Sequence, residues 1–249
     1  MRLLVTAGPT REFFDSVRFI TNASTGKMGY AIAREAARRG HTVTLVSGPV
    51  ALPVPRGVKC IPVTTAAEMA QACRRALREV DAMVMTAAVC DYRPVETAAQ
   101  KLPKKNRAYR IALEPTEDIA AALGARKGGR ILVGFAMEDH DARPHAERKC
   151  ARKNCDLIVL NGPENVGADR AVVELYAPGR GWFDSLTGTK AAVARGLLRV
   201  LEDLQGSGRP PTSASSAEPR RPAGHAPSRP RNGAVDPRRR THRPRASAP

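Results

Sequence analysis

Residues 3–9 read LLVTAGP, a short apolar run that ends at once in a small residue, a glycine and a proline. Five further runs rich in Val, Ile and Leu lie at residues 42–46, 58–63, 82–85, 130–135 and 157–160. Segments with helical spacing lie between most of them, at 29–39, 66–80, 117–123 and 142–153. This alternation predicts a doubly wound α/β fold, whose mostly parallel Rossmann-like sheet carries helices on both faces. Residues 170–176 then alternate between apolar and polar, and 189–204 have the spacing of a last helix.

The basic residues are distributed unevenly along the chain, which has 249 residues and a formal net charge of +17. Residues 206–249 hold ten Arg, nine Pro and two acidic residues, and therefore +8 of that charge. They contain no Leu, Ile, Met or aromatic residue, so burial cannot offset the entropy cost of ordering them. We expect one α/β domain over residues 1–205 and a disordered Arg/Pro-rich tail over 206–249.

Several classes of protein do not fit the composition. No apolar run approaches the roughly 20 residues that a bilayer span needs, and the first run is too short for a signal peptide. The five cysteines are never spaced C-x-x-C, which disfavours a disulfide scaffold or a cysteine zinc site. The sequence therefore predicts a cytoplasmic protein that does not bind to a membrane.

The first connection is too long for a nicotinamide-binding turn. Such a turn lies directly between the first strand and the first helix, whereas 17 residues separate Gly8 from Gly26. The second apolar run also leads into Ser47 rather than into an acidic residue that would bind a ribose hydroxyl. Gly26-Lys27 is followed by Met28, which excludes a Walker A phosphate loop.

Residues 22–29, NASTGKMG, are the strongest candidate for an anion site. In a doubly wound sheet, ligands bind beyond the carboxyl ends of the strands, where this segment lies. Ser24 or Thr25 can cap the following helix, and the small residues let backbone N–H groups approach a phosphate. The alternative is an ordinary capped helix whose glycines serve close packing.

Three other polar features follow predicted strands or lie on predicted helices. Asp91 can meet a ribose or a cation, or can cap its own turn. Residues 100–105, QKLPKK, can form a mobile basic flap over a polyphosphate, or a solvated loop. Lys149 and Lys153 repel each other at helical spacing, which an anionic ligand would relieve, although a solvated face is the simpler explanation of the pair.

No nucleophile or metal site stands out from the spacing. Glu138, Asp139 and Asp141 fit an acidic cluster at a helix start better than a magnesium site. Cys90 fits a small packing residue better than a nucleophile, and no Ser/His/Asp or Cys/His arrangement is present.

A set of motifs over roughly residues 1–204 carries a family resemblance: TAGPTRE (6–12), VRFITN (17–22), STGKMG (24–29), VTLVSGP (43–49), AAV (87–89), DYR (91–93), GFA (134–136), KN (153–154) and DLI (156–158). Together they resemble phosphopantothenoylcysteine synthetase, the ligase domain of the bacterial coenzyme A bifunctional protein. This domain belongs to the DNA/pantothenate metabolism flavoprotein C-terminal family.

The resemblance implies a ligase that joins 4′-phosphopantothenate to L-cysteine in coenzyme A biosynthesis. It implies an acyl-cytidylate intermediate, formed from CTP with release of pyrophosphate and consumed by the cysteine amine with release of CMP. It further implies Mg²⁺ with CTP as co-substrate, and a homodimer. Because no decarboxylase domain precedes residue 1, it also implies a separate phosphopantothenoylcysteine decarboxylase.

The same resemblance assigns roles to individual residues. Asn22 and Lys101 become the catalytic residues, with Lys101 as the flap lysine on the phosphates. The implied nucleotide contacts are Asp91, Lys101, Glu117, Asp118, Ile119, Ala120, Phe135, Lys149 and Lys153. The implied substrate contacts are Arg18, Asn22, Ser24, Thr25, Gly26, Lys27 and Ala88, and the metal ligands stay open.

The match has departures, and two other functions stay open. Pro103 stiffens the flap, residues 114–119 replace a shorter Asn/Thr-Pro-Asp-Ile pattern, and residues 136–139 are also off the usual pattern. The first alternative is an NAD(P)-linked Rossmann-fold oxidoreductase. The second is a protein that binds nucleic acid through the basic tail, non-specifically and with a steep salt dependence.

Overall fold

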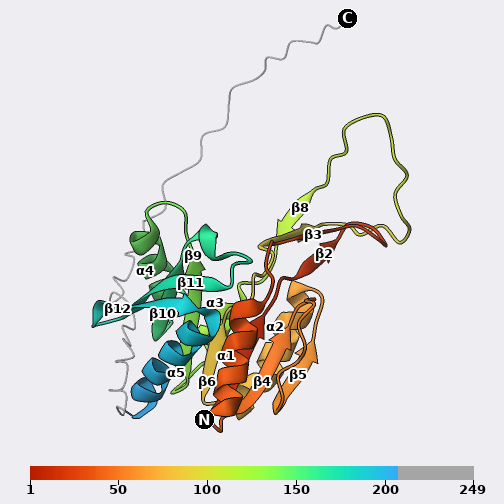
Figure 1. The fold of residues 1–249 in the computed structure, drawn as a ribbon. Helices are drawn as coiled ribbons and strands as arrows, with labels where there is room; N and C mark the ends of the chain where they lie inside the picture. The colour runs from red at the N-terminus through yellow and green to blue at the C-terminus, as the bar shows by residue number, and fades with distance from the viewer. Residues whose placement is uncertain (207–249) are drawn as a thin grey trace, which may run out of the picture. The chain divides into compact units, whose positions relative to one another are not determined.

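Eight strands form the central sheet, in the order β12-β11-β10-β9-β6-β1-β4-β5 (Figure 1). The first six in chain order pair in parallel, and β11 and β12 add two antiparallel strands at one edge. The predicted doubly wound, mostly parallel sheet is therefore confirmed. Its strands are β1 (Arg2–Ala7), β4 (Thr42–Ser47), β5 (Val58–Pro62), β6 (Ala82–Met85), β9 (Ile131–Met137), β10 (Leu157–Asn161), β11 (Arg170–Ala177) and β12 (Gly181–Thr189).

This computed structural model describes residues 1–206. The tail predicted after residue 205 therefore lies, from residue 207 on, outside the described residues, and the division of the chain there stays a prediction. The nucleic-acid hypothesis, which depends on that tail, stays open with it. Within residues 1–206, no helix is both long enough and apolar enough to cross a bilayer.

Helices cover both faces of the sheet, as the alternation of apolar runs predicts. Leu3 and Val5 of β1 pack in the cluster that contains α1 and α5, whereas Leu4 packs in the cluster of the other three helices. The helices are α1 (Lys27–Arg38), α2 (Ala66–Ala76), α3 (Ile119–Gly124), α4 (Ala142–Arg152) and α5 (Lys190–Gly206), with short 3-10 turns η1 (Leu77–Glu79) and η2 (Pro163–Asn165). Figure 1 shows α1 and α5 together on one face.

The point where the strand order reverses lies between β1 and β6. The parallel strands follow the Rossmann order, because β4 and β5 extend from one side of β1 while β6, β9 and β10 extend from the other. The helix α1 packs closely over this point: a Cβ on Gly29 would lie only 2.6 Å from the Ala7 Cβ and from the Thr86 Oγ1. The start of α1 is thus fixed at the crevice where such sheets bind ligands.

Two small hairpins rise from the carboxyl edge of the sheet, and the sequence did not predict them. One pairs β2 (Arg11–Phe13) with β3 (Phe19–Thr21), and the other pairs β7 (Tyr92–Pro94) with β8 (Leu113–Pro115). The long connection before α1 is therefore a folded hairpin rather than an extended turn. Residues 95–112 form the loop that projects beyond β7 and β8 in Figure 1.

Candidate active site

A cavity of about 390 Å³ opens beside the point where the strand order reverses. Five parts of the chain contribute most of its wall: residues 22–29, residues 86–88 after β6, Phe135 of β9, residues 165–167, and Lys190 at the start of α5. The predicted substrate contacts from Asn22 to Lys27, together with Ala88, therefore lie on one cavity. Of the predicted nucleotide contacts, Phe135 joins them there.

The helix α1 begins without a side-chain cap. Its N-cap is Gly26, which has a left-handed backbone (φ +73°), and the Ser24 hydroxyl accepts from the Gly26 N–H (3.3 Å) instead of from the helix. The prediction that Ser24 or Thr25 caps this helix is therefore wrong, because the glycine adds a left-handed residue between them and the first turn. The helix N-terminus, with its partial positive charge, faces the cavity without a capping side chain.

Asn22 links the loop before α1 to the segment after β6. Its Nδ2 donates to the carbonyl oxygens of Ala88 (3.2 Å) and Val89 (3.0 Å). The segment after β6 is itself held against the first connection, since the Ala88 N–H donates to the Gly8 carbonyl (3.0 Å). Asn22 and Ala88 are thus neighbours on the cavity wall, and both N–H groups of the Asn22 amide already have acceptors.

Two lysines complete the cavity wall. The Nζ of Lys27 donates to the Gly167 carbonyl (3.0 Å) and to Asp169 Oδ1 (2.6 Å). The Nζ of Lys190 donates to the Asn165 carbonyl (3.0 Å), and burial together with the charge of Lys27 lowers the pKa of Lys190. Lys190 was not predicted from the sequence, because it is there only a polar residue at a helix start and no spacing connects it with Lys27.

Most of the other predicted nucleotide contacts do not line this cavity. Asp118 caps α3 and pairs with Lys153 (3.1 Å), while Lys149 pairs with Glu138 (2.5 Å). Burial opposes ionisation of Asp118, but the backbone N–H at the start of α3 and the Lys153 charge hold its pKa below the ordinary value. The repulsion between the two lysines is thus relieved within the chain, rather than only by an anionic ligand.

The segment from Glu117 to Ala120 offers few free side chains. The Glu117 carboxylate pairs with Arg74 (2.6 Å), and the Ile119 side chain is buried in the core. Ala120 packs, half-buried, against the same core cluster. The Ile119 side chain fills the core between α3 and the sheet, so the predicted nucleotide contact at this residue, which stays a prediction, would have to be made by its backbone.

Asp91 lies between the cavity wall and the start of α3. Its carbonyl accepts from the Thr116 N–H (2.9 Å), while its side chain is exposed. The preceding Cys90 is buried, donates its thiol to the Thr10 carbonyl (3.5 Å) and has a pKa raised by burial. These observations agree with the interpretation of Cys90 as a packing residue.

Arg18 does not line the cavity, although it was predicted to contact substrate. Its guanidinium donates to the buried Asp15 carboxylate (2.8 and 2.5 Å) and to the Leu102 carbonyl (2.7 Å). Asp15 also accepts from the Leu102 N–H (3.1 Å). Burial alone would raise the pKa of Asp15, but these hydrogen bonds hold it well below the ordinary range. Arg18 and Asp15 together fix the chain next to Lys101.

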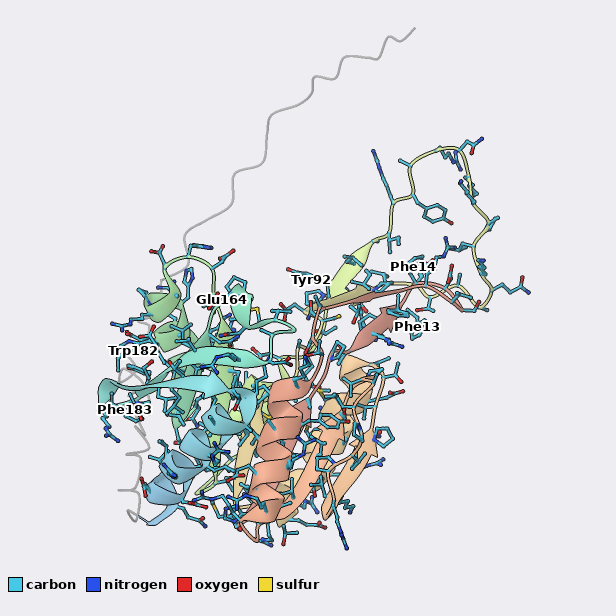
Figure 2. All side chains as sticks on the ribbon, viewed as in Figure 1. Phe13, Phe14, Tyr92, Glu164, Trp182 and Phe183 are labelled. Atoms are coloured by element: carbon cyan, nitrogen blue, oxygen red, sulfur yellow. The ribbon has the colours of Figure 1, made fainter. Side chains whose placement is uncertain are left out.

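Lys101 itself is exposed and lies in the loop 95–112, away from the described cavity wall. The loop is attached to the β2–β3 hairpin, because Thr97 Oγ1 donates to the Phe13 carbonyl (2.8 Å) and the Ala98 N–H to the Phe14 carbonyl (3.1 Å). Figure 2 shows Phe13 and Phe14 where the hairpin meets this loop. The structure therefore brings Asn22 and Ala88 together but leaves Lys101 outside their group.

The fold and the cavity define the class of protein as a doubly wound α/β domain with an uncapped helix N-terminus and two lysines at its switch point. The chain belongs to the DNA/pantothenate metabolism flavoprotein C-terminal domain family, whose model matches residues 1–204. The family resemblance predicted from the motifs is therefore confirmed.

Individual relatives agree with this family. The chain is 44% identical over 179 residues to the coenzyme A biosynthesis bifunctional protein CoaBC of Bacillus subtilis, a match that covers 70% of this chain and 44% of that protein. It is 41% identical over 212 residues to the CoaBC protein of Vibrio vulnificus strain YJ016, covering 82% and 52%. The chain thus spans about half the length of the curated relatives it matches.

Solved structures share the fold. The crystal structure of the C-terminal domain of a CoaBC protein superposes with a TM-score of 0.71 at 39% identity, covering 83% of this chain and 96% of that domain. A structure of the Cab2 mutant H337A in complex with phosphopantothenate-cysteine has a TM-score of 0.70 at 14% identity, which shows a common fold.

Proposed function

We propose that this domain is a ligase that joins 4′-phosphopantothenate to L-cysteine in coenzyme A biosynthesis, through an acyl-cytidylate made from CTP. The observation that carries the proposal is the cavity where Asn22 lies beside an uncapped helix N-terminus and the cations Lys27 and Lys190. Such a cavity suits a phosphate-bearing substrate. The membership of residues 1–204 in the family supports the same activity.

The proposed reaction has two steps. A carboxylate oxygen of phosphopantothenate attacks the α-phosphorus of CTP, and the bond to pyrophosphate breaks. The neutral amine of cysteine then attacks the acyl carbon, the bond to the CMP oxygen breaks, and the amine proton passes to solvent. Both steps depend on positioning and charge stabilisation, with no covalent bond to the protein.

In this scheme Asn22 stabilises the negative charge that develops on the acyl oxygen in the second step. Both N–H groups of its amide donate to backbone carbonyls in this structure. One of them must therefore turn from Ala88 or Val89 to the substrate as the reaction proceeds. A single donor of this kind typically stabilises a transition state by about 2.7–4 kcal/mol.

Lys101 supplies positive charge to the triphosphate in the same scheme. The hydrogen bonds at Leu102 hold the backbone next to Lys101 in place, so the long side chain of Lys101, rather than a movement of the whole loop, presents the charge to the triphosphate. The nucleotide contacts assigned to Lys149 and Lys153 require the nucleotide to compete with the carboxylates that now pair with them.

The proposed reaction uses Mg²⁺ together with CTP. Nowhere in residues 1–206 do three or more His, Cys, Asp or Glu side chains gather into a group that could hold a metal ion. Mg²⁺ that binds with a nucleotide usually takes one or two carboxylates together with substrate phosphates, rather than an all-protein group. We therefore assign the ion to the triphosphate of CTP and assign no step to a metal held by the protein.

The full chain, with phosphopantothenate, cysteine, Mg²⁺ and either CTP or ATP, tests this proposal through the pyrophosphate released. We expect release that depends on phosphopantothenate and is faster with CTP. Folded protein that releases none with either nucleotide would refute the ligase, whereas faster release with ATP would overturn only the choice of CTP. Lys101→Ala should lose most turnover at an unchanged melting temperature, and wild-type kinetics would remove Lys101 from the mechanism.

We also expect the working protein to be a cytoplasmic homodimer whose product is consumed by a phosphopantothenoylcysteine decarboxylase. Light scattering of the purified chain tests the dimer. A mass of one chain at working concentration would contradict it.

A further inference from the structure

The charges around the cavity at the switch point are unbalanced. Two of the described residues that line it, Lys27 and Lys190, are cationic, and none of the described lining residues carries a carboxylate. Lys27 is paired with Asp169, whose side chain lies in solvent with 87% of its area exposed. The hydrogen bond that Lys190 makes goes to a neutral group, the Asn165 carbonyl, at 3.0 Å.

The hydrogen bond from Lys190 is not needed to hold Asn165 in place. Asn165 is already fixed by its own side chain, which donates to the Val172 carbonyl (2.8 Å) and accepts from the Val172 N–H (3.2 Å). Its backbone N–H also closes a turn on the Gly162 carbonyl (3.2 Å). An ammonium has three N–H donors, and the bond to Asn165 uses one of them. Lys190 therefore has donors to offer to a ligand.

The electrostatics of the wall favour an anion. Lys190 is half-buried, and its burial and the nearby charge of Lys27 disfavour its ionised form more strongly than the charge of Asp169 favours it, so its pKa is lowered. The uncapped start of α1 adds a partial positive charge to the same wall. A phosphate dianion beside Lys27 and Lys190 would offset the repulsion between them and accept hydrogen bonds from both.

We propose that Lys190 is a substrate-binding residue which, together with Lys27 and the N-terminus of α1, holds a phosphate group inside the cavity. The identity of the substrate rests on the proposed function, and the inference adds to it a residue that the family motifs did not indicate. Two substrates of that reaction carry the required chemistry, because both phosphopantothenate and CTP present phosphate oxygens.

Titration calorimetry without turnover tests this role. The variants are Lys190→Met, which removes the charge at similar length, and Lys190→Arg, which retains it. Lys59→Met is the control, since Lys59 is exposed on the edge strand β5. The ligands are phosphopantothenate, CTP and pantothenate, which lacks the phosphate.

We expect Lys190→Met to bind one phosphate-bearing ligand about tenfold or more weakly. Lys190→Arg should keep most of the affinity, and the control all of it. A loss confined to phosphopantothenate identifies its phosphate as the group held, and a loss confined to CTP identifies the nucleotide. Unchanged affinity for both, or an equal loss for pantothenate, would overturn the assignment.

The titrations give a different result if the chain is not the proposed ligase. If the wild-type chain binds neither phosphopantothenate nor CTP, inorganic pyrophosphate becomes the probe. Pyrophosphate binding that Lys190→Met weakens about tenfold, at an unchanged melting temperature, would uphold the anion site without the ligase. Binding that is absent, or equal in the two proteins, would overturn the site as well.

Discussion

Replacing Asn22 by alanine separates its structural role from its chemical role. The amide of Asn22 makes two hydrogen bonds, of 3.2 and 3.0 Å, to carbonyls of the segment after β6. Aspartate is a poorer test, because its carboxylate would face the same two carbonyl oxygens and repel them. Alanine removes the donor and adds no charge.

The expected magnitudes of the two roles differ. Each lost hydrogen bond to a backbone carbonyl costs about 0.5–1.5 kcal/mol, so the stability of Asn22→Ala should fall by about 1–3 kcal/mol. A domain with an unfolding free energy of about 5–15 kcal/mol stays folded after such a loss. Losing a donor to the transition state should cost about 2.7–4 kcal/mol, or about a hundredfold to a thousandfold in turnover. A large fall in turnover at a modest fall in stability is therefore the expected pattern.

The assay measures pyrophosphate release and amide formation separately in a single turnover. We expect Asn22→Ala to release pyrophosphate and then accumulate acyl-cytidylate, because the second step is the slowed one. The matched control is Thr21→Val at the end of β3, next to Asn22, which removes a hydrogen bond to the Thr10 carbonyl (2.7 Å) but does not touch the cavity. Turnover of Asn22→Ala within a few-fold of that control would refute the catalytic role.

Three further predictions concern residues that stabilise the fold around the site. Lys127→Ala should lose about 3–5 kcal/mol in urea denaturation, since it breaks the buried ion pair with Asp156, whose two side chains are 3% and 10% exposed; a loss below about 1 kcal/mol contradicts this. Gly29→Ala should cost about 1–3 kcal/mol and weaken ligand binding, because its Cβ would lie 2.6 Å from that of Ala7; wild-type stability and affinity argue against the close packing. Asp15 has a folded pKa below its ordinary value of 3.8, so its stabilisation is full above that pH and fades as the pH falls below it. The stability difference between the wild type and Asp15→Asn should therefore shrink from about pH 7 to pH 3, and a constant difference would contradict this.

The parallel core was predictable because strands that are buried on both faces require a pattern of residues that is easily recognised in the sequence. A strand such as β1 must be apolar at successive positions, since Leu3 and Leu4 face different helix layers. The intervening helices must be apolar on one side only. These two patterns fixed the fold class, and element ends such as that of α1 differ from the predicted ones by only a residue or two.

The hairpins β2–β3 and β7–β8 have no comparable sequence pattern. Their strands have three residues each, too few for an alternating pattern to be recognised, and few of those residues are buried. The strand β12 is also mostly exposed or half-buried, so its polar residues resemble a loop. Short or solvated strands depend on contacts with the rest of the sheet, which the local sequence does not show.

The candidate site was predictable where its residues stand in recognisable motifs, as Asn22 to Lys27, Ala88 and Phe135 do. The residues from Asn22 to Lys27 stand in one motif, and the structure places them on one cavity. Lys27 and Asp169, which form an ion pair, lie 142 residues apart in the sequence, and no local pattern predicts their contact. Lys190 and the pairing of Lys153 with Asp118 were missed for the same reason, since both depend on contacts between distant segments.

The fate of the substrate's own oxygen atoms tests the central claim most directly. Phosphopantothenate labelled with ¹⁸O in its carboxylate is incubated with CTP, cysteine and the full chain, and the products are analysed by mass spectrometry. Attack of the carboxylate on the α-phosphorus predicts that one labelled oxygen appears in CMP. Label in inorganic phosphate or in pyrophosphate, with none in CMP, would contradict the acyl-cytidylate route.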